Sequence, residues 1–132
     1  MRNSYCSAGI AVVILTVGCS SMPHKARPTS PEAFPAVGHV YHADLGEIAL
    51  DLDFSSAGQM TFTGTQGSVK GDQQTVSYTV TPLRPGLFAV TWAEKQGKIV
   101  QIEDFEQGTL HSFVTLSSGH TAHLSGRLTR VR

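Results

Sequence analysis

The sequence predicts an all-β protein: an antiparallel up-and-down barrel of about eight strands, preceded by an export signal and a tether. Two observations favour this fold class. Apolar and polar residues alternate with a period of two along several short runs, which is typical of strands that bury one face. Glycine-containing breaks separate these runs at the spacing of hairpin connections.

Length and charge indicate one globular domain without a nucleic-acid partner. The chain has 132 residues and a formal net charge of zero, which suits a single hydrophobic core. The sequence contains no run of Lys or Arg, so it lacks the electrostatic footprint of a nucleic-acid binder.

Residues 1–18 are predicted to be a signal peptide. Arg2 precedes an uncharged apolar stretch from Ala8 to Val17, which is the order of segments in an export signal. The stretch is about ten residues long, whereas a helix needs roughly 20 to span a bilayer. We expect this segment to direct export and then to be removed.

Cys19 is predicted to be lipidated. The residues Leu15-Thr16-Val17-Gly18-Cys19 resemble the bacterial lipobox, which implies cleavage before Cys19 and attachment of acyl chains such as palmitate. Thr16 stands where that motif usually has Leu, Val or Ile, and an ordinary secretory signal with an incidental thiol is the alternative. Several acyl chains, at about 0.8 kcal/mol per buried CH₂, form a stable membrane anchor.

The residues after Cys19 predict a location and a tether. Ser20 occupies the position where Asp commonly retains lipoproteins in the inner membrane. The absence of Asp at this position resembles the outer-membrane sorting pattern. In a Gram-negative envelope, this resemblance implies that the protein is attached at the periplasmic face of the outer membrane. Residues 19–36 are rich in Ser and Pro and predict a flexible tether. The folded domain is expected over residues 37–132.

Strand candidates follow one another through this domain. The run from Ile48 to Phe54 shows the pattern, because apolar side chains at alternate positions enclose Ala or Asp. The candidates are His39–Ala43, Ile48–Phe54, Met60–Thr63, Val76–Val80, Leu87–Trp92, Ile99–Glu103, Thr109–Leu116 and Thr121–Leu128. A closed barrel is preferred to a sandwich because short hairpins connect it and no sheet edge is left exposed. Barrels of about eight strands are either filled by side chains or hold one small ligand.

The segment between Val76 and Phe105 resembles the MoaF-like family. The matching features are Tyr78 within a strand, the turn Arg84-Pro85-Gly86-Leu87, the pair Trp92 and Glu94, and Asp104-Phe105. The similarity extends from about Val37 to Arg130. It implies a calycin-like barrel related in shape to lipocalins and bacterial phenolic acid decarboxylases. It implies little about biochemical role, because molybdenum-cofactor assembly, after which the family is named, is cytoplasmic.

The candidate ligand-binding residues are Tyr78, Arg84, Phe88, Trp92, Glu94 and Asp104. Even spacing places Phe88, Trp92 and Glu94 on one strand face. If this face is interior, burial raises the pKa of Glu94 and suits it to bind or protonate a ligand. The alternative is a solvated carboxylate at the barrel rim, because Glu94 adjoins the turn at Lys95.

The other candidates also have structural alternatives. Tyr78 suits the core, and Arg84 lies in a Pro-flanked turn where its guanidinium could receive a carboxylate ligand. Asp104 could orient Arg84 or close the next turn by accepting backbone N–H groups. Phenolic acid decarboxylases use a comparable set of Tyr, Arg and Glu side chains, with Tyr41 as a second candidate for the tyrosine. The sequence does not show that these side chains converge.

The histidines do not predict a metal site, and no cofactor is expected. His39 and His42, like His120 and His123, are three residues apart, a spacing that places strand side chains on opposite faces. A cross-strand pair between His111 and either His120 or His123 stays open. The sequence has no G-x-S-x-G elbow and no cysteine after residue 19, so nucleophilic catalysis has no support.

The sequence leaves several classes of function open. We prefer a tethered barrel that captures a small amphipathic ligand or engages an envelope protein. The alternatives are a small lyase-like enzyme and an inhibitor or immunity-type protein. A cavity of about 300 Å³ or more, lined by Phe88, Trp92 and Glu94, would favour ligand binding, whereas a solid core would favour an interaction surface.

Overall fold

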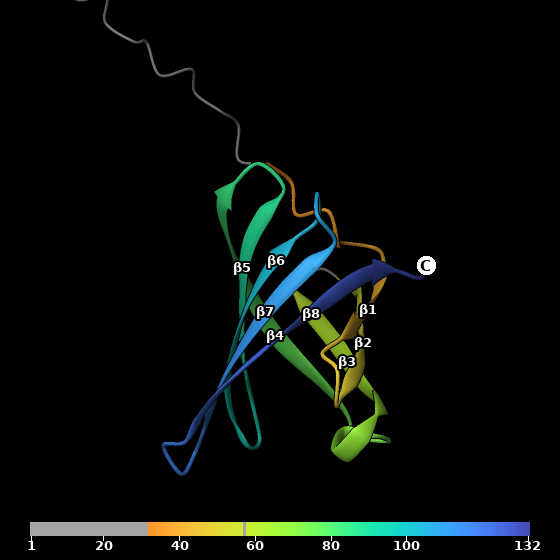
Figure 1. Cartoon of the computed structure of the whole chain (residues 1–132). Helices are drawn as coiled ribbons and strands as arrows, with labels where there is room; N and C mark the ends of the chain where they lie inside the picture. Colours follow the sequence, from red (N-terminus) through yellow and green to blue (C-terminus); the bar gives the residue numbers. More distant parts are fainter. Residues whose placement is uncertain (1–31, 57) are drawn as a thin grey trace, which may run out of the picture.

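The computed structural model describes residues 32–56 and 58–132, which form one closed antiparallel β-barrel (Figure 1). The predicted signal peptide, Cys19 and most of the predicted tether lie outside the described residues and stay predictions. Within the described part, the one helical element is the short 3₁₀ turn η1 (Gly67–Val69). No helix there is long and apolar enough to cross a membrane.

Each predicted strand candidate corresponds to a strand in the structure. The strands are β1 (Val40–Asp44), β2 (Ala49–Ser56), β3 (Gln59–Gln66), β4 (Gln73–Arg84), β5 (Leu87–Glu94), β6 (Gly97–Asp104), β7 (Thr109–Leu116) and β8 (Thr121–Arg130). Several are longer than predicted, because backbone pairing with a neighbouring strand continues past the last apolar residue.

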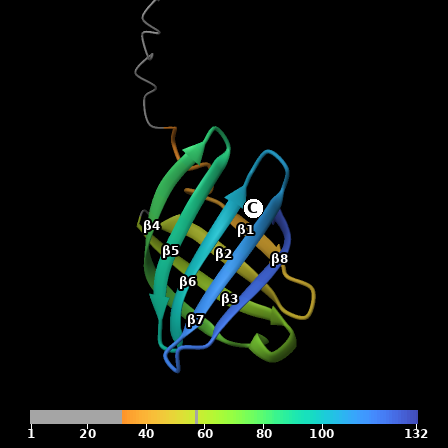
Figure 2. The ribbon, with the colours of Figure 1, turned by 60° about the vertical axis from the view of Figure 1, so that its left-hand side comes forward.

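The strands are joined in an up-and-down order. Each strand pairs with the next along the chain, and β8 pairs with β1 to close the barrel, with Leu128 opposite Ala43. Figure 2 shows β5 to β8 in the front wall and β1 to β3 crossing behind them. This arrangement confirms the predicted fold class.

Alternate residues of each strand face the interior, as a period of two requires. In β2 the side chains of Leu52 and Phe54 are fully buried, and in β5 the same holds for Phe88 and Val90. The face that carries Phe88, Trp92 and Glu94 is therefore the interior face. The core is continuous from strand to strand because hairpin partners present the same face.

Phe34 closes one end of the barrel, which we call the closed end. The centroid of its ring lies 5.4 Å from Phe54, 5.4 Å from Phe88 and 5.5 Å from Phe105. All three contacts are edge-to-face, a geometry that aromatic quadrupoles favour. Ala36 is also fully buried. The last residues of the predicted tether therefore pack against the barrel.

Candidate functional site

A cavity opens at the opposite end of the barrel, which we call the mouth. It lies among the β1–β2, β3–β4, β5–β6 and β7–β8 connections and has a volume of about 240 Å³. At ~30 Å³ for each water in the liquid, this equals about eight water molecules. Its apolar wall includes Leu50, Phe62, Val114 and Leu124. The cavity is smaller than the roughly 300 Å³ expected of a ligand site, and Trp92 and Glu94 line it while Phe88 does not. It therefore suits a ligand that is smaller than a drug-sized molecule.

Two residues that line the cavity each carry a buried polar atom without a hydrogen-bond partner. These atoms are the donor Trp92 Nε1 and the acceptor Gln101 Oε1, on residues that are 5% and 0% exposed. Gln101 Nε2 donates only a long bond, 3.4 Å, to Ser112 Oγ. Trp92 pairs with Ile99, so Gln101 is its diagonal neighbour on the inner face. An unpaired buried polar group costs about 1–3 kcal/mol, so a ligand that pairs with these two atoms is stabilised here.

Carboxylates and amides surround the mouth. Glu94 and Asp72 line the cavity there, together with Gln74 and Gln96. Burial, followed by the negative charge of Asp72, raises the pKa of Glu94 above its ordinary value. Glu94 is partly exposed, so it combines the two positions considered for it: an inward-facing side chain close to the rim.

Glu103 is a carboxylic acid sealed inside the barrel. It is 0% exposed, and neither carboxylate oxygen has a hydrogen-bond partner. Desolvation raises its pKa from 4.5 to about 8, so the group is protonated at neutral pH. Burial, with a smaller contribution from Glu103, raises the pKa of Tyr41 and of Tyr78. These three groups therefore share the interior towards the closed end.

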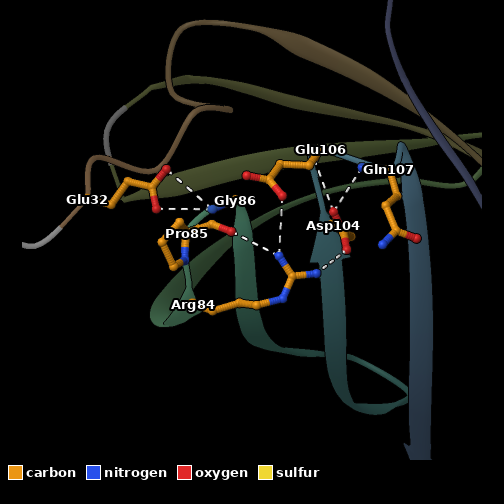
Figure 3. A network of polar contacts seen from close by, with 7 residues as sticks. All are labelled: Glu32, Arg84, Pro85, Gly86, Asp104, Glu106 and Gln107. Atoms are coloured by element: carbon orange, nitrogen blue, oxygen red, sulfur yellow. Dashed lines mark hydrogen bonds and ion pairs between the residues drawn. The ribbon is translucent and has the colours of Figure 1, made fainter.

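At the closed end, Arg84 and Asp104 form an ion pair (Figure 3). Arg84 Nη2 donates to Asp104 Oδ2 at 2.7 Å, and Nη1 contacts Glu106 Oε2 at 3.4 Å. The second oxygen of Asp104 accepts the backbone N–H groups of Gln107 at 2.9 Å and Glu106 at 3.1 Å. The Gln107 N–H bond and, with smaller effects, Arg84 and the Glu106 N–H hold the pKa of Asp104 below its ordinary value. Asp104 thus both orients Arg84 and closes the β6–β7 turn.

Gly86 connects the N-terminal segment to these polar contacts (Figure 3). Its N–H donates to both carboxylate oxygens of Glu32, at 3.0 and 3.3 Å. Its backbone φ is +75°, and a Cβ here would lie 2.5 Å from Cγ of Glu106. Glycine therefore satisfies both the conformation and the space. We call Glu32, Arg84, Gly86, Asp104, Glu106 and Gln107 the closed-end network.

The family model for MoaF-like proteins matches residues 37–129, nearly the whole barrel. The chain belongs to the MoaF-like family. A crystal structure of "a putative beta-lactamase from Burkholderia vietnamiensis" is similar to this barrel, with a TM-score of 0.72 and 26% sequence identity. The match covers 76% of this chain and 99% of that chain. No curated protein matches the chain significantly.

The MoaF-like barrel places the predicted ligand-binding residues in three groups. These are Trp92 and Glu94 in the cavity wall, Arg84 and Asp104 in the closed-end network, and Tyr78 and Phe88 in contact with the ring of Phe34. Tyr78, Arg84 and Glu94 are therefore not brought together at the cavity. The guanidinium of Arg84 is already bound by two carboxylates of the protein.

Sequence reasoning did not single out Gln101, Glu103 or Ser112 in this MoaF-like chain. A signal was present, because the short β5–β6 hairpin places Gln101 opposite Val90 and Glu103 opposite Phe88. Directly opposite residues in an antiparallel pair point to the same face, so an interior face in β5 requires an interior Gln101 and Glu103.

Two histidines meet on the outer face of the MoaF-like barrel. His111 Nδ1 lies 3.1 Å from His123 Nε2 across the β7–β8 hairpin, and His123 stacks on the ring of Phe113 at 4.6 Å. The cross-strand pair that the sequence left open is therefore formed. Within residues 32–56 and 58–132, no group of three or more His, Cys, Asp or Glu side chains could hold a metal ion.

Proposed function

We propose that this MoaF-like protein is a lipid-anchored envelope protein whose barrel binds a small amphipathic ligand. The observation that carries the proposal is the pair of unpartnered polar atoms, Trp92 Nε1 and Gln101 Oε1, on two residues that line a largely apolar cavity. A ligand end that offers an acceptor and a donor satisfies both atoms. The rest of the ligand then packs against apolar side chains such as Phe62 and Leu124.

The position of the N-terminal segment at the closed end supports access of a ligand to this cavity. We propose acylation at Cys19 and attachment at the periplasmic face of the outer membrane. The described chain begins at Glu32, whose carboxylate accepts a hydrogen bond from the N–H of Gly86 in the β4–β5 turn. The cavity opens at the other end of the barrel, beside Leu45 and Gln96. A domain tethered from its closed end keeps its mouth free for a ligand.

Native mass spectrometry of protein purified from its own envelope tests the proposal. The expected spectrum contains a bound small molecule and the mass of acyl groups on Cys19. Trp92 is the single tryptophan of the chain and lines the cavity, so its fluorescence should change when the identified ligand is titrated back. No co-purifying molecule and no ligand-dependent change in Trp92 emission would count against the proposal.

Substitution of Gln101 distinguishes specific binding in the cavity from nonspecific hydrophobic association. Gln101→Met keeps the length of the side chain and removes both polar atoms, so we expect at least about tenfold weaker binding. Gln59→Met, at an exposed position of β3, is the matched control and should bind like the wild type. Equal affinity in the Gln101→Met variant would remove this amide from the site.

A proton-transfer enzyme is the second candidate, and Glu103 is the observation that favours it. A carboxylic acid that is protonated near neutral pH can serve as a general acid. Glu103 does not line the cavity. A substrate would therefore have to pass the side chain of Gln101 or displace Phe34 to reach it. The enzyme candidate predicts that Glu103→Gln abolishes turnover of a substrate found by screening, while Glu94→Gln tests the carboxylate at the mouth.

The similarity to the putative beta-lactamase from Burkholderia vietnamiensis suggests one defined substrate for that screen, a beta-lactam. Hydrolysis of a chromogenic cephalosporin by the purified protein would support a lactam-directed enzyme. The rate should then fall in the Glu103→Gln or the Glu94→Gln variant if either carboxyl group takes part. A rate equal to the buffer background in the wild-type protein would exclude this substrate.

A further inference from the structure

We infer that the cavity selects a small amphiphilic amine: a ligand with an ammonium group at the mouth and an uncharged polar group at the deep end. The inference rests on the proposed ligand-binding function and narrows its ligand class. It is carried by the position of Glu94 and Asp72 at the mouth and by the unpartnered amide oxygen of the fully buried Gln101, which lines the same cavity.

The ionisable side chains that line the cavity are acidic. Among the described residues, Glu94 and Asp72 line it and no Lys, Arg or His does. Lys70 and Lys95 are close to these carboxylates in the sequence, but the ion pairs found in the described part of the chain involve neither lysine. An anionic ligand would therefore meet like charge at the mouth, whereas an ammonium supplies the opposite charge.

The electrostatics of Glu94 also favour a cation. Burial and then the charge of Asp72 disfavour the ionised form of Glu94 and raise its pKa. An opposite charge within about 4–6 Å favours the ionised form. An ammonium between the two carboxylates therefore stabilises ionised Glu94 and relieves its repulsion with Asp72.

The deep end of the cavity favours an uncharged group. Gln101 Oε1 needs a donor, and Trp92 Nε1 needs an acceptor. An amide or hydroxyl group meets both needs, because each contains a donor and an acceptor. A second charge at this depth would be desolvated without a counter-ion, which is far more costly than burying a neutral polar group.

The distance between the two ends limits the length of the ligand. Gln101 lies opposite Val90, and Glu94 lies further along the same strand β5. The rise along β5 from Val90 to Glu94 is about 14 Å at ~3.4 Å per residue. We therefore propose a spacer of about six carbons between the polar groups of the ligand, which is shorter than this rise and leaves the flexible side chain of Glu94 to reach the ammonium.

Three matched probes test this inference: caproamide, ε-aminocaproamide and adipic acid monoamide. They share one amide end and a six-carbon chain, and they differ at the other end, which is a methyl group, a protonated aminomethyl group or a carboxylate. Each is titrated into the full protein purified from its envelope in non-ionic detergent, with Trp92 emission and native mass spectrometry as readouts. We expect ε-aminocaproamide to bind about tenfold tighter than caproamide, and adipic acid monoamide to bind more weakly than both.

The variants connect that preference to the mouth. Glu94→Gln should lower the affinity for ε-aminocaproamide to near that of caproamide and leave caproamide binding unchanged. Glu106→Gln, at an exposed carboxylate of the closed-end network, is the matched control and should leave all three affinities unchanged. Gln101→Met should weaken all three probes alike, because they share the amide end.

Two outcomes would overturn the inference in distinguishable ways. If ε-aminocaproamide binds no tighter than caproamide, or if Glu94→Gln weakens both probes equally, the cation preference is wrong and ligand binding stands. If none of the three probes changes Trp92 emission or appears in the native mass spectrum, the proposed ligand-binding cavity is itself contradicted.

Discussion

Replacing Glu103 with Gln should make the stability of the protein less dependent on pH. Glu103 is 0% exposed, and burial raises its pKa from 4.5 to about 8. In the unfolded chain the carboxyl group ionises above about pH 4.5, whereas in the folded barrel it stays protonated to about pH 8. The folded state therefore binds more protons than the unfolded state in this window. The wild-type protein should lose stability as the pH rises through it.

The size of this effect follows from the two pKa values. Each pKa unit corresponds to about 1.36 kcal/mol. The difference between 4.5 and about 8 therefore amounts to about 5 kcal/mol above pH 8 and about 3 kcal/mol at pH 7. These are large fractions of the roughly 5–15 kcal/mol by which a domain is stable. Gln does not titrate, so the variant escapes this loss.

Urea unfolding at several pH values between 5 and 9 measures the effect. The free energy of unfolding of Glu103→Gln, minus that of the wild type, should increase by several kcal/mol across this range. Glu103→Leu is a matched control, because it is also uncharged but lacks the amide. It should show the same pH trend, displaced by a constant offset. A difference between Glu103→Gln and wild type that does not vary with pH would refute the assignment of a buried, protonated Glu103.

Three further predictions concern the closed end and the anchor. Phe34→Ala should lower the free energy of unfolding by about 3 kcal/mol, because its ring is surrounded by other aromatic rings; a loss below about 0.5 kcal/mol in urea unfolding would contradict this packing. Gly86→Ala should cost about 1–2 kcal/mol, because a side chain is strained at a φ of +75° and the added Cβ displaces the flexible side chain of Glu106. Gly119→Ala, with a φ of +87° and no atom within 4 Å, is the control and should cost only about 1 kcal/mol; equal losses would remove the steric contribution. Cys19→Ala should abolish acyl labelling and release the protein from membranes, and continued labelling would show that Cys19 is not the acylated residue.

The fold was predictable because its signals are local. Alternation of apolar and polar residues along β2 and β5 identified both the strands and their buried faces. Gly97, Gly108 and Gly119 marked hairpins, and short hairpins leave neighbouring strands little choice but to pair. The face of Trp92 and Glu94 followed from the same period of two.

The candidate site was predictable only in part. Trp92 and Glu94 could be placed on one apolar strand face, but the sequence left open whether Glu94 lies inside the barrel or at its rim. Gln101 and Glu103 were missed because polar residues in a strand ordinarily face water, and only the pairing with β5 turns them inward. Both roles of Asp104, orienting Arg84 and closing the next turn, could be stated from the sequence, but only the structure shows that one carboxylate serves both.

The sequence by itself determined the number and order of the strands, because each strand and hairpin is encoded by neighbouring residues. The tertiary structure alone decided what the closed barrel encloses. Pairing of β8 with β1 fixes the interior volume, and the packing of Phe34 fills one end of it. The remaining space becomes a cavity that Gln101, with an unpartnered amide oxygen, lines at depth and Glu94 lines at the mouth. Burial and missing partners arise only when distant segments exclude water together, so no local pattern encodes them.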